Sequence, residues 1–194
     1  SELELARQFG VGRQTIREAL GSLEMSGFIT IQRGTKGGPV IENTILHIAS
    51  NSLMNAIQMQ NITLDDLTAA RIEIERGVLM HVLKNADASD IRSLQENVSN
   101  AKGEIKNDIR ASALNVEFHR LLAKATKNPV FEIVVDSIMA VAADYLSRIE
   151  LGLEQSKRSV NDHEALLSAI IEKNTTKAVK VLEDHLRLLG SLYQ

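Results

Sequence analysis

The fold of the first part of the chain is determined by residues 1–41, which read SELELARQFGVGRQTIREALGSLEMSGFITIQRGTKGGPVI. Ser1-Glu2-Leu3-Glu4 has the pattern of a capping box, in which the serine and glutamate side chains bond free amides at a helix start. Gly10-Val11-Gly12 interrupts this helix, and apolar residues at helical spacing predict a second helix from Arg13 to about Met25. Two short helices joined by a glycine-containing turn form a helix-turn-helix.

A β-hairpin is predicted directly after the second helix. Phe28–Ile31 and Pro39–Ile41 have the composition of short strands. The segment between them, Arg33–Gly38, is rich in glycine and includes the basic residues Arg33 and Lys36. A hairpin with a basic turn after two such helices predicts a winged helix-turn-helix domain over residues 1–41.

The polar face of the second predicted helix carries Arg13, Gln14 and Arg17, opposite its apolar stripe. An arginine can bond a guanine or a phosphate, and a glutamine can bond a base edge in the major groove. Such side chains are also typical of an ordinary solvated helix face, but the agreement of helix, turn, helix and basic wing favours binding of double-stranded DNA. Two copies on a two-fold axis would read a pseudo-palindromic operator, so we expect a homodimer.

The composition of the 194-residue chain excludes several other classes of protein. It has no cysteine, and therefore neither a disulfide framework nor a thiolate metal site. No apolar run is long enough to span a membrane and no signal peptide opens the chain, so we expect a cytoplasmic protein without a membrane partner. The net charge is −3, but residues 1–41 carry five basic and four acidic residues, whereas the remainder carries 17 basic and 21 acidic ones.

From residue 42 onward the pattern is helical throughout, and Pro129 stands at a predicted helix start. We expect a linker helix within residues 42–62, and then a helical domain over residues 63–194 with short loops. Its expected helices are residues 63–84, 87–100, 106–126, 129–153, 156–173 and 175–192. The predicted fold is mainly α: an N-terminal winged helix-turn-helix followed by an antiparallel all-helical bundle of six to seven helices.

Three histidines of the predicted bundle are candidate metal ligands. His119 lies one turn after Asn115 on the same helix face, and His163 and His185 lie on two further helices. A bundle can bring such side chains together, and three imidazoles suit Zn²⁺ or Ni²⁺ while leaving positions open for water or a carboxylate. Taken singly, each histidine is more often a surface or hydrogen-bonded core residue, so spacing alone leaves both interpretations open.

The N-terminal pattern resembles the winged helix-turn-helix of GntR-type transcription regulators, through the order and spacing of Glu2–Ala6, Val11–Leu20 and Leu23–Gly27. The resemblance implies DNA contacts from Arg13, Gln14, Thr15, Arg17, Arg33 and Gly34. Leu3 and Gly12 depart from the family pattern, in which an arginine and a Ser or Thr are usual. This suggests fewer phosphate contacts or a different operator. The family also has a helix before this point, so we expect the chain to be a trimmed or partly ordered version of a longer protein.

Residues from about Thr63 onward resemble the FCD-type effector domain that accompanies this class of DNA-binding domain. The resemblance implies a divalent metal, Zn or Ni, bound by Asn115, His119, His163 and His185. Asn115 is a departure, because Asp is the commoner first ligand and a neutral amide is a weaker donor. Arg71 is a candidate for bidentate binding of an effector carboxylate, with an ion pair to Glu75 as the alternative. Arg148 is a second candidate for the effector site.

These patterns together predict a metabolite-responsive transcription regulator. A small carboxylate at the metal would change the spacing of the two winged domains through the linker helix, and relief of repression is the commoner outcome in the proteins that the chain resembles. One alternative is a DNA-binding regulator whose bundle only dimerises. A zinc-dependent enzyme is a remote alternative, because no catalytic base is evident near the histidines and an enzyme would not explain the arginines and the wing.

Overall fold

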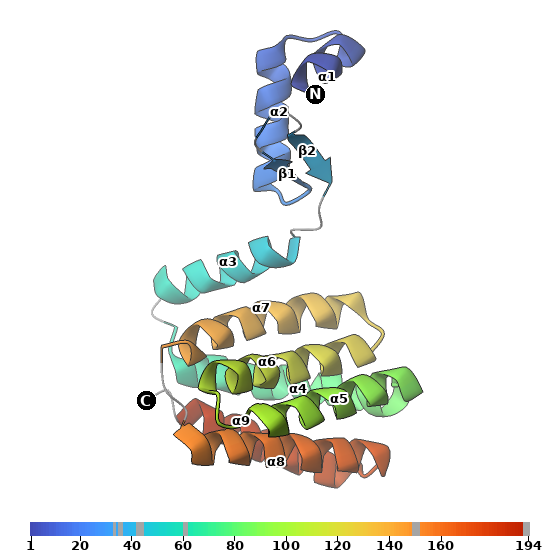
Figure 1. Ribbon diagram of the computed structural model, residues 1–194, viewed down its shortest axis with the longest axis vertical. Coiled ribbons are helices and arrows are strands. Elements are labelled where there is room, and N and C mark those ends of the chain that lie inside the picture. Colours follow the sequence, from blue (N-terminus) through green and yellow to red (C-terminus); the bar gives the residue numbers. More distant parts are fainter. Residues whose placement is uncertain (33, 35–36, 42–44, 60–61, 149–151, 192–194) are drawn as a thin grey trace. The chain divides into compact units, whose positions relative to one another are not determined.

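The computed structural model describes residues 1–32, 34, 37–41, 45–59, 62–148 and 152–191. The chain divides into two compact units, Ser1–Ser52 and Leu53–Gln194, and the boundary between them falls within helix α3 (Ile45–Met59). Figure 1 draws the elements of both units.

The N-terminal unit begins with two helices and a two-stranded antiparallel sheet, namely α1 (Glu2–Phe9), α2 (Arg13–Met25), β1 (Ile29–Gln32) and β2 (Gly38–Ile41). Helix α1 starts in the predicted capping box, where the amide of Glu4 donates to the hydroxyl of Ser1 at 3.3 Å. It ends at Gly10, whose φ of 66° is a left-handed conformation that glycine adopts without strain.

A small core joins these elements. It is formed by the buried side chains of Ala6, Ile16, Leu20 and Ile29, which come from α1, α2 and β1. In the sheet Ile29 pairs with Ile41, and the amide of Ile31 donates to Glu24 Oε1 of α2 at 2.9 Å. The predicted winged helix-turn-helix is confirmed.

The C-terminal unit is an all-helical bundle. In the described part of the chain its helices after α3 are α4 (Leu64–Asn85), α5 (Ala88–Glu104), α6 (Asp108–Ala125), α7 (Pro129–Leu146), α8 (Gly152–Ile171) and α9 (Thr175–Ser191). Five of the helix starts are capped by the side chain of the preceding residue, which is Thr63, Asp87, Asn107, Asn128 or Asn174. The predicted mainly α fold, with a bundle of six helices after the linker helix, is confirmed.

One predicted helix is shorter in the structure. The periodic pattern that predicts a helix over residues 129–153 ends at Leu146, where Ser147 caps α7. Helix α8 begins at Gly152, whose φ is 72°. A positive φ is outside the right-handed helical region, so Gly152 does not continue a helix from the residues before it, although the sequence pattern favours one.

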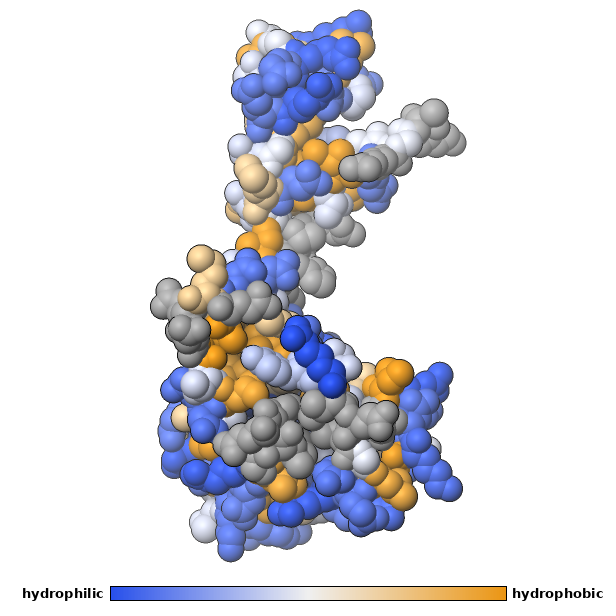
Figure 2. Space-filling view, turned by 90° about the vertical axis from the view of Figure 1, so that its left-hand side faces the viewer, coloured by the Kyte–Doolittle hydropathy of each residue, from blue (hydrophilic) through white to orange (hydrophobic). Residues whose placement is uncertain are grey.

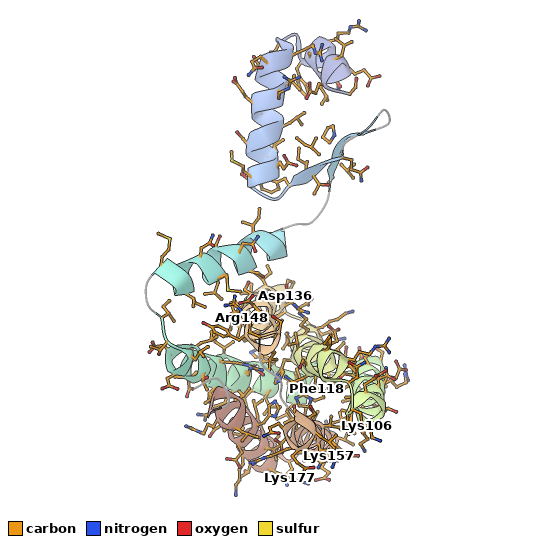
Figure 3. All side chains as sticks on the ribbon, turned by 60° about the vertical axis from the view of Figure 1, so that its left-hand side comes forward. Lys106, Phe118, Asp136, Arg148, Lys157 and Lys177 are labelled. Atoms are coloured by element: carbon orange, nitrogen blue, oxygen red, sulfur yellow. The ribbon has the colours of Figure 1, made fainter. Side chains whose placement is uncertain are left out.

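The arrangement of the helices places the inner face of α6 at the centre of the bundle, since α6 contacts α4, α5, α7 and α8. Helix α9 packs on α4 and α8. The core is mainly aliphatic, and Phe118 of α6 is fully buried in it. Figure 3 shows Phe118 between the helices, whereas Lys157 and Lys177 lie at the outside of the bundle.

The surface of the bundle is mostly hydrophilic on the face drawn in Figure 2, with smaller hydrophobic patches between the polar side chains. Exposed apolar residues include Met80, Ile109 and Val130. Apolar side chains of this kind are common on protein surfaces and need no partner. Among the described helices, none is both long and apolar enough to cross a membrane.

Candidate functional site

The three predicted histidines meet in the core of the bundle. His119 of α6, His163 of α8 and His185 of α9 are each exposed to 2% or less. Each offers one ring nitrogen, and these nitrogens all lie within 4.8 Å of one another. Nε2 of His163 and Nε2 of His185 are 3.2 Å apart. We call these three residues the histidine cluster.

A buried glutamate orients the first ring of the histidine cluster. Nδ1 of His119 is 2.5 Å from Oε2 of Glu75, which lies on α4 and is exposed to only 2%. A carboxylate partner at Nδ1 fixes the proton there, which leaves the lone pair of Nε2 free toward the cluster. Nε2 of His119 is buried and has no hydrogen-bond partner among the described residues. A buried, unpartnered imidazole nitrogen beside two others fits the donor set of a divalent metal.

Arg71 also contributes to this arrangement. Its Nε donates to Oε1 of Glu75 at 2.5 Å, and its Nη2 lies 3.8 Å from Sδ of Met139. The ion pair with Glu75, one of the two roles considered for Arg71, is therefore present, but it is buried rather than at the surface. The arginine neutralises the carboxylate that holds His119.

A second carboxylate faces His185. Oδ2 of Asp162 lies 3.4 Å from Nδ1 of His185, so two of the three rings have an acidic partner at Nδ1. Neither carboxylate is predicted from the sequence as a partner of a histidine. Glu75 is 44 residues from His119 and Asp162 is 23 residues from His185. The one available signal was the spacing of Arg71 and Glu75, which places two opposite charges on the same face of a helix with buried neighbours.

Burial keeps the histidine cluster neutral. It lowers the pKa of His119 to about 4, with the charge of Arg71 acting in the same direction and that of Glu75 opposing it. Burial also lowers the pKa of His163 and of His185. For Glu75, burial would raise the pKa, but the charges of His119 and Arg71 outweigh it and lower the value to about 2. At neutral pH the cluster thus presents neutral imidazoles, the form that binds a metal ion.

Asn115, the fourth predicted ligand, lies one turn before His119 on α6 and is also buried. Its Oδ1 accepts a hydrogen bond from Oγ of Ser159 at 2.6 Å. Together with His163, both residues line a cavity of about 10 Å³ between α5, α6 and α8. The structure thus places Asn115 beside the histidine cluster, on the side of this cavity.

Arg148 lies away from the cluster, at the surface beyond the C-terminal end of α7. Its side chain is 61% exposed, and its Nη2 is 2.6 Å from Oδ2 of Asp144. Figure 3 labels Arg148 on the outer side of the bundle. A role of Arg148 in effector binding stays a prediction.

The residues predicted to contact DNA lie on the first turns of α2. Arg13, Gln14, Thr15 and Arg17 are all exposed. Nη2 of Arg17 lies 3.0 Å and Nη2 of Arg13 lies 3.9 Å from the same atom, Oε2 of Glu2. Gln14 donates to Oε1 of Glu18 at 2.9 Å. The carboxylate of Glu2 on α1 therefore binds Arg17 and lies close to Arg13, at one end of the exposed face.

The predicted wing is only partly described. Gly34 lies in the turn between β1 and β2 and has a φ of 121°, in the region that favours glycine. Arg33 and Lys36 lie outside the described residues. The wing contacts implied for Arg33 and Gly34 stay predictions.

Both parts of the chain match known families. Residues 1–36 match the model of bacterial regulatory proteins of the gntR family, and residues 66–188 match that of the FCD domain. The second match contains all three histidines of the cluster together with Arg71, Glu75 and Asn115.

Several curated relatives align over nearly the whole chain. The uncharacterized HTH-type transcriptional regulator YcbG of Bacillus subtilis is 28% identical over 189 residues, which are 97% of this chain and 77% of that protein. The HTH-type transcriptional repressor NanR of Enterobacter sp. is 26% identical over 200 residues, covering 100% and 75% of the two chains. The Uxu operon regulator of Haemophilus influenzae is 26% identical over 96% of this chain and 70% of its own length.

Solved structures share the fold. A GntR protein of Streptococcus agalactiae superimposes with a TM-score of 0.78 at 23% identity, over 99% of this chain and 88% of its own. A transcriptional regulator of the same family from Pseudomonas syringae gives a TM-score of 0.53 at 26% identity, over 100% and 76% of the two chains.

Proposed function

Because this chain belongs to the GntR family of bacterial regulatory proteins and carries an FCD domain, we propose that it is a metal-dependent, carboxylate-responsive repressor. It binds a pseudo-palindromic operator as a homodimer in the cytoplasm. The gntR family match and the relatives named above are regulators of transcription, so the chain is a regulator of transcription and not a zinc enzyme. The repressor relative from Enterobacter supports the direction of the regulation.

One observation carries the proposal for the metal. The histidine cluster places three buried, neutral imidazoles together, and Nε2 of His119 has no other partner among the described residues. Burying an unpaired polar atom is unfavourable, so such an atom indicates a partner that is bound during function. Imidazole ligands favour Zn²⁺ or Ni²⁺ over harder cations. Glu75 and Asp162 would support the rings of His119 and His185 from behind.

The ligand set argues for an anionic effector. Three imidazoles and the neutral side chain of Asn115 leave the charge of a divalent ion uncompensated, and such an ion supplies an open position for a carboxylate oxygen. The guanidinium of Arg71 is paired with Glu75, and Glu75 in turn bonds His119. Arg71 therefore supports the metal site indirectly, through these two residues. A free carboxylate would bind the ion more strongly here than in a site with an Asp ligand.

The effector acts on DNA binding through the linker helix α3, which joins the two units. Each protomer presents Arg13, Gln14, Thr15 and Arg17 to one half of the operator, and an effector that favours one arrangement of the two DNA-binding units changes the affinity. A coupling of this kind is typically about 1–3 kcal/mol, which changes operator occupancy several-fold or more.

The test begins with elemental analysis of protein purified without a metal-affinity tag. Near-stoichiometric zinc or nickel is expected in the wild type and in His81→Ala, which removes an exposed histidine whose ring contacts Phe131. The metal should be lost in His163→Ala/His185→Ala. Metal-loaded and metal-free protein are then compared for binding to an operator selected from random duplexes, with and without acetate. Equal operator affinity in all of these samples would instead show that the bundle serves only to dimerise the protein.

A further inference from the structure

A serine on α8 has a buried hydroxyl that the described residues do not satisfy. Ser156 is exposed to only 2%, and its Oγ has no hydrogen-bond partner in the part of the chain that the structure describes. Several other helical serines of this protein bond a carbonyl of the preceding turn. Ser137 donates to the carbonyl of Ile133 at 2.8 Å, and Ser93 donates to that of Ser89 at 3.1 Å. The hydroxyl of Ser156 does not make this bond, although back-bonding of this kind is common for a serine inside a helix.

The unpartnered hydroxyl lines the cavity beside the histidine cluster. Ser156, Ser159 and His163 are three and four residues apart, so they lie along one face of α8, and Asn115 of α6 faces them. The cavity has a volume of about 10 Å³, which is room for about one water molecule or a group of that size. Its remaining described lining is formed by the apolar side chains of Ala101, Ala111 and Val160.

The chemistry of this lining selects the group that can enter. Apart from the imidazole of His163, a proposed metal ligand, the described lining consists of the amide of Asn115, two hydroxyls and apolar side chains, none of which carries a charge. The ion is already bound by the first carboxylate of the ligand, so a second carboxylate would lose its water here for contacts with neutral groups alone, which is unfavourable. A hydroxyl has the size of the cavity, and it can both donate to and accept from serine hydroxyls.

We propose that Ser156 and Ser159 form a subsite for a hydroxyl group of the effector, so that the protein selects small hydroxylated carboxylates. This inference rests on the proposed function, in which the carboxylate of the same molecule binds at the metal. The Oγ of Ser156 makes the new hydrogen bond, and Ser159, held by Oδ1 of Asn115, fixes the opposite side of the cavity. The site thereby binds two groups of the effector, the anionic carboxylate at the metal and the neutral hydroxyl at Ser156.

The inference is tested by calorimetry on the zinc-loaded full chain with two pairs of acids, acetate with glycolate and propionate with lactate. Ser156→Ala is the decisive variant, because it removes only the unpartnered hydroxyl and alanine suits a helix. We expect it to weaken glycolate and lactate about fivefold to tenfold, the range of one net hydrogen bond, and to leave acetate, propionate and zinc binding unchanged. The matched control is Ser137→Ala, a buried serine on α7 whose hydroxyl is already bonded, and it should change none of these affinities.

The possible outcomes separate this inference from the proposed function. A hydroxy acid also gains affinity by placing its hydroxyl on the metal, so the preference of the wild type alone decides nothing. A preference for glycolate over acetate that is the same in the wild type and in Ser156→Ala overturns the subsite and leaves the carboxylate-binding metal site in place. Failure of the zinc-loaded wild type to bind any of the four acids overturns both.

Discussion

Glu75 and His119 are hydrogen-bonded at 2.5 Å across the bundle, although 44 residues separate them in the chain. Glu75 also binds Arg71, so a line of three buried side chains ends at the unpartnered Nε2 of His119. The bond from Glu75 sets the tautomer and orientation of the His119 ring. Glu75 therefore contributes to metal binding without contacting the ion.

The first prediction concerns the hydrogen bond by which Glu75 orients His119. In Glu75→Gln the ring of His119 loses its charged partner and Arg71 is left buried without one. We expect zinc affinity to fall about 10–100-fold, as for other groups behind a ligand histidine. The unpaired arginine should also lower the free energy of unfolding by about 3–5 kcal/mol. Zinc titration and urea unfolding measure the two effects.

A double variant separates metal binding from stability. Arg71→Met/Glu75→Gln removes the uncompensated charge, so it should regain most of the lost stability while zinc binding stays weak. If zinc binding returns together with stability, Glu75 only stabilises the fold and does not orient His119.

The second prediction is a loss of stability at acidic pH in the metal-free protein. Burial lowers the pKa of His119 from 6.5 to about 4, so below pH 6.5 the unfolded chain binds a proton that the folded chain does not. Stability from this group is complete above pH 6.5 and is lost as the pH falls to about 4. A shift of this size corresponds to about 3 kcal/mol. The lowered pKa of Glu75 adds a loss in the same direction below pH 4.5.

Urea unfolding of metal-free protein from roughly pH 7.5 to roughly pH 4.5 measures this dependence, because this range runs from above the unfolded pKa of 6.5 down toward the folded pKa of about 4. The His163→Ala/His185→Ala variant has fewer buried imidazoles and should show a flatter profile. A wild-type profile that is already flat across this window would contradict the neutral, buried state of the cluster.

How far the sequence predicts this protein depends on whether a feature is local. The capping residues Ser1, Thr63, Asp87 and Asn128 bond amides two or three residues away, so the sequence alone placed these helix starts well. The histidines were identified by spacing and by family resemblance. Their partners Glu75 and Asp162 were not, since each depends on how two helices are turned toward one another. The hydroxyl of Ser156 is buried without a described partner because of how α8 packs against α5 and α6, and a local sequence pattern cannot predict this.

The third prediction concerns Asn115, where the family more often has an Asp. Asn115→Asp places a negative charge beside the histidine cluster, and an aspartate can still accept the hydrogen bond of Ser159. We expect zinc affinity to rise and the affinity of the zinc-loaded protein for acetate to fall, because the added charge compensates the ion. Calorimetry with zinc and then with acetate measures both, and an unchanged acetate affinity would rule out the second effect.

The fourth prediction concerns Glu2, whose carboxylate lies beside both Arg13 and Arg17. Glu2→Gln removes a negative charge from the DNA-binding face, so affinity for a random-sequence duplex should rise several-fold and depend more steeply on salt. The arginines also lose the group that positions them, so discrimination between a selected operator and the random duplex should fall. Fluorescence anisotropy at two salt concentrations measures both quantities. Glu4 lies on the same helix, and among the described residues its carboxylate binds Ser1, so Glu4→Gln should leave the discrimination unchanged.

The last prediction tests the close approach of α9 to α4. A Cβ added at Gly190 would lie 2.7 Å from Oγ1 and 2.8 Å from Cγ2 of Thr68, which is closer than packed atoms tolerate. Gly190→Ala should therefore lower the free energy of unfolding by about 1–3 kcal/mol, as overpacking does. Gly103→Ala is the matched control, since its Cβ meets nothing within 4 Å and should stabilise α5 by about 0.4–1 kcal/mol. Thr68→Ala removes the two nearest atoms and leaves only the Cβ at 3.3 Å, so the double variant with Gly190→Ala should regain most of the loss. Equal stability of Gly190→Ala and the wild type would show that the two helices pack less closely than the structure has them.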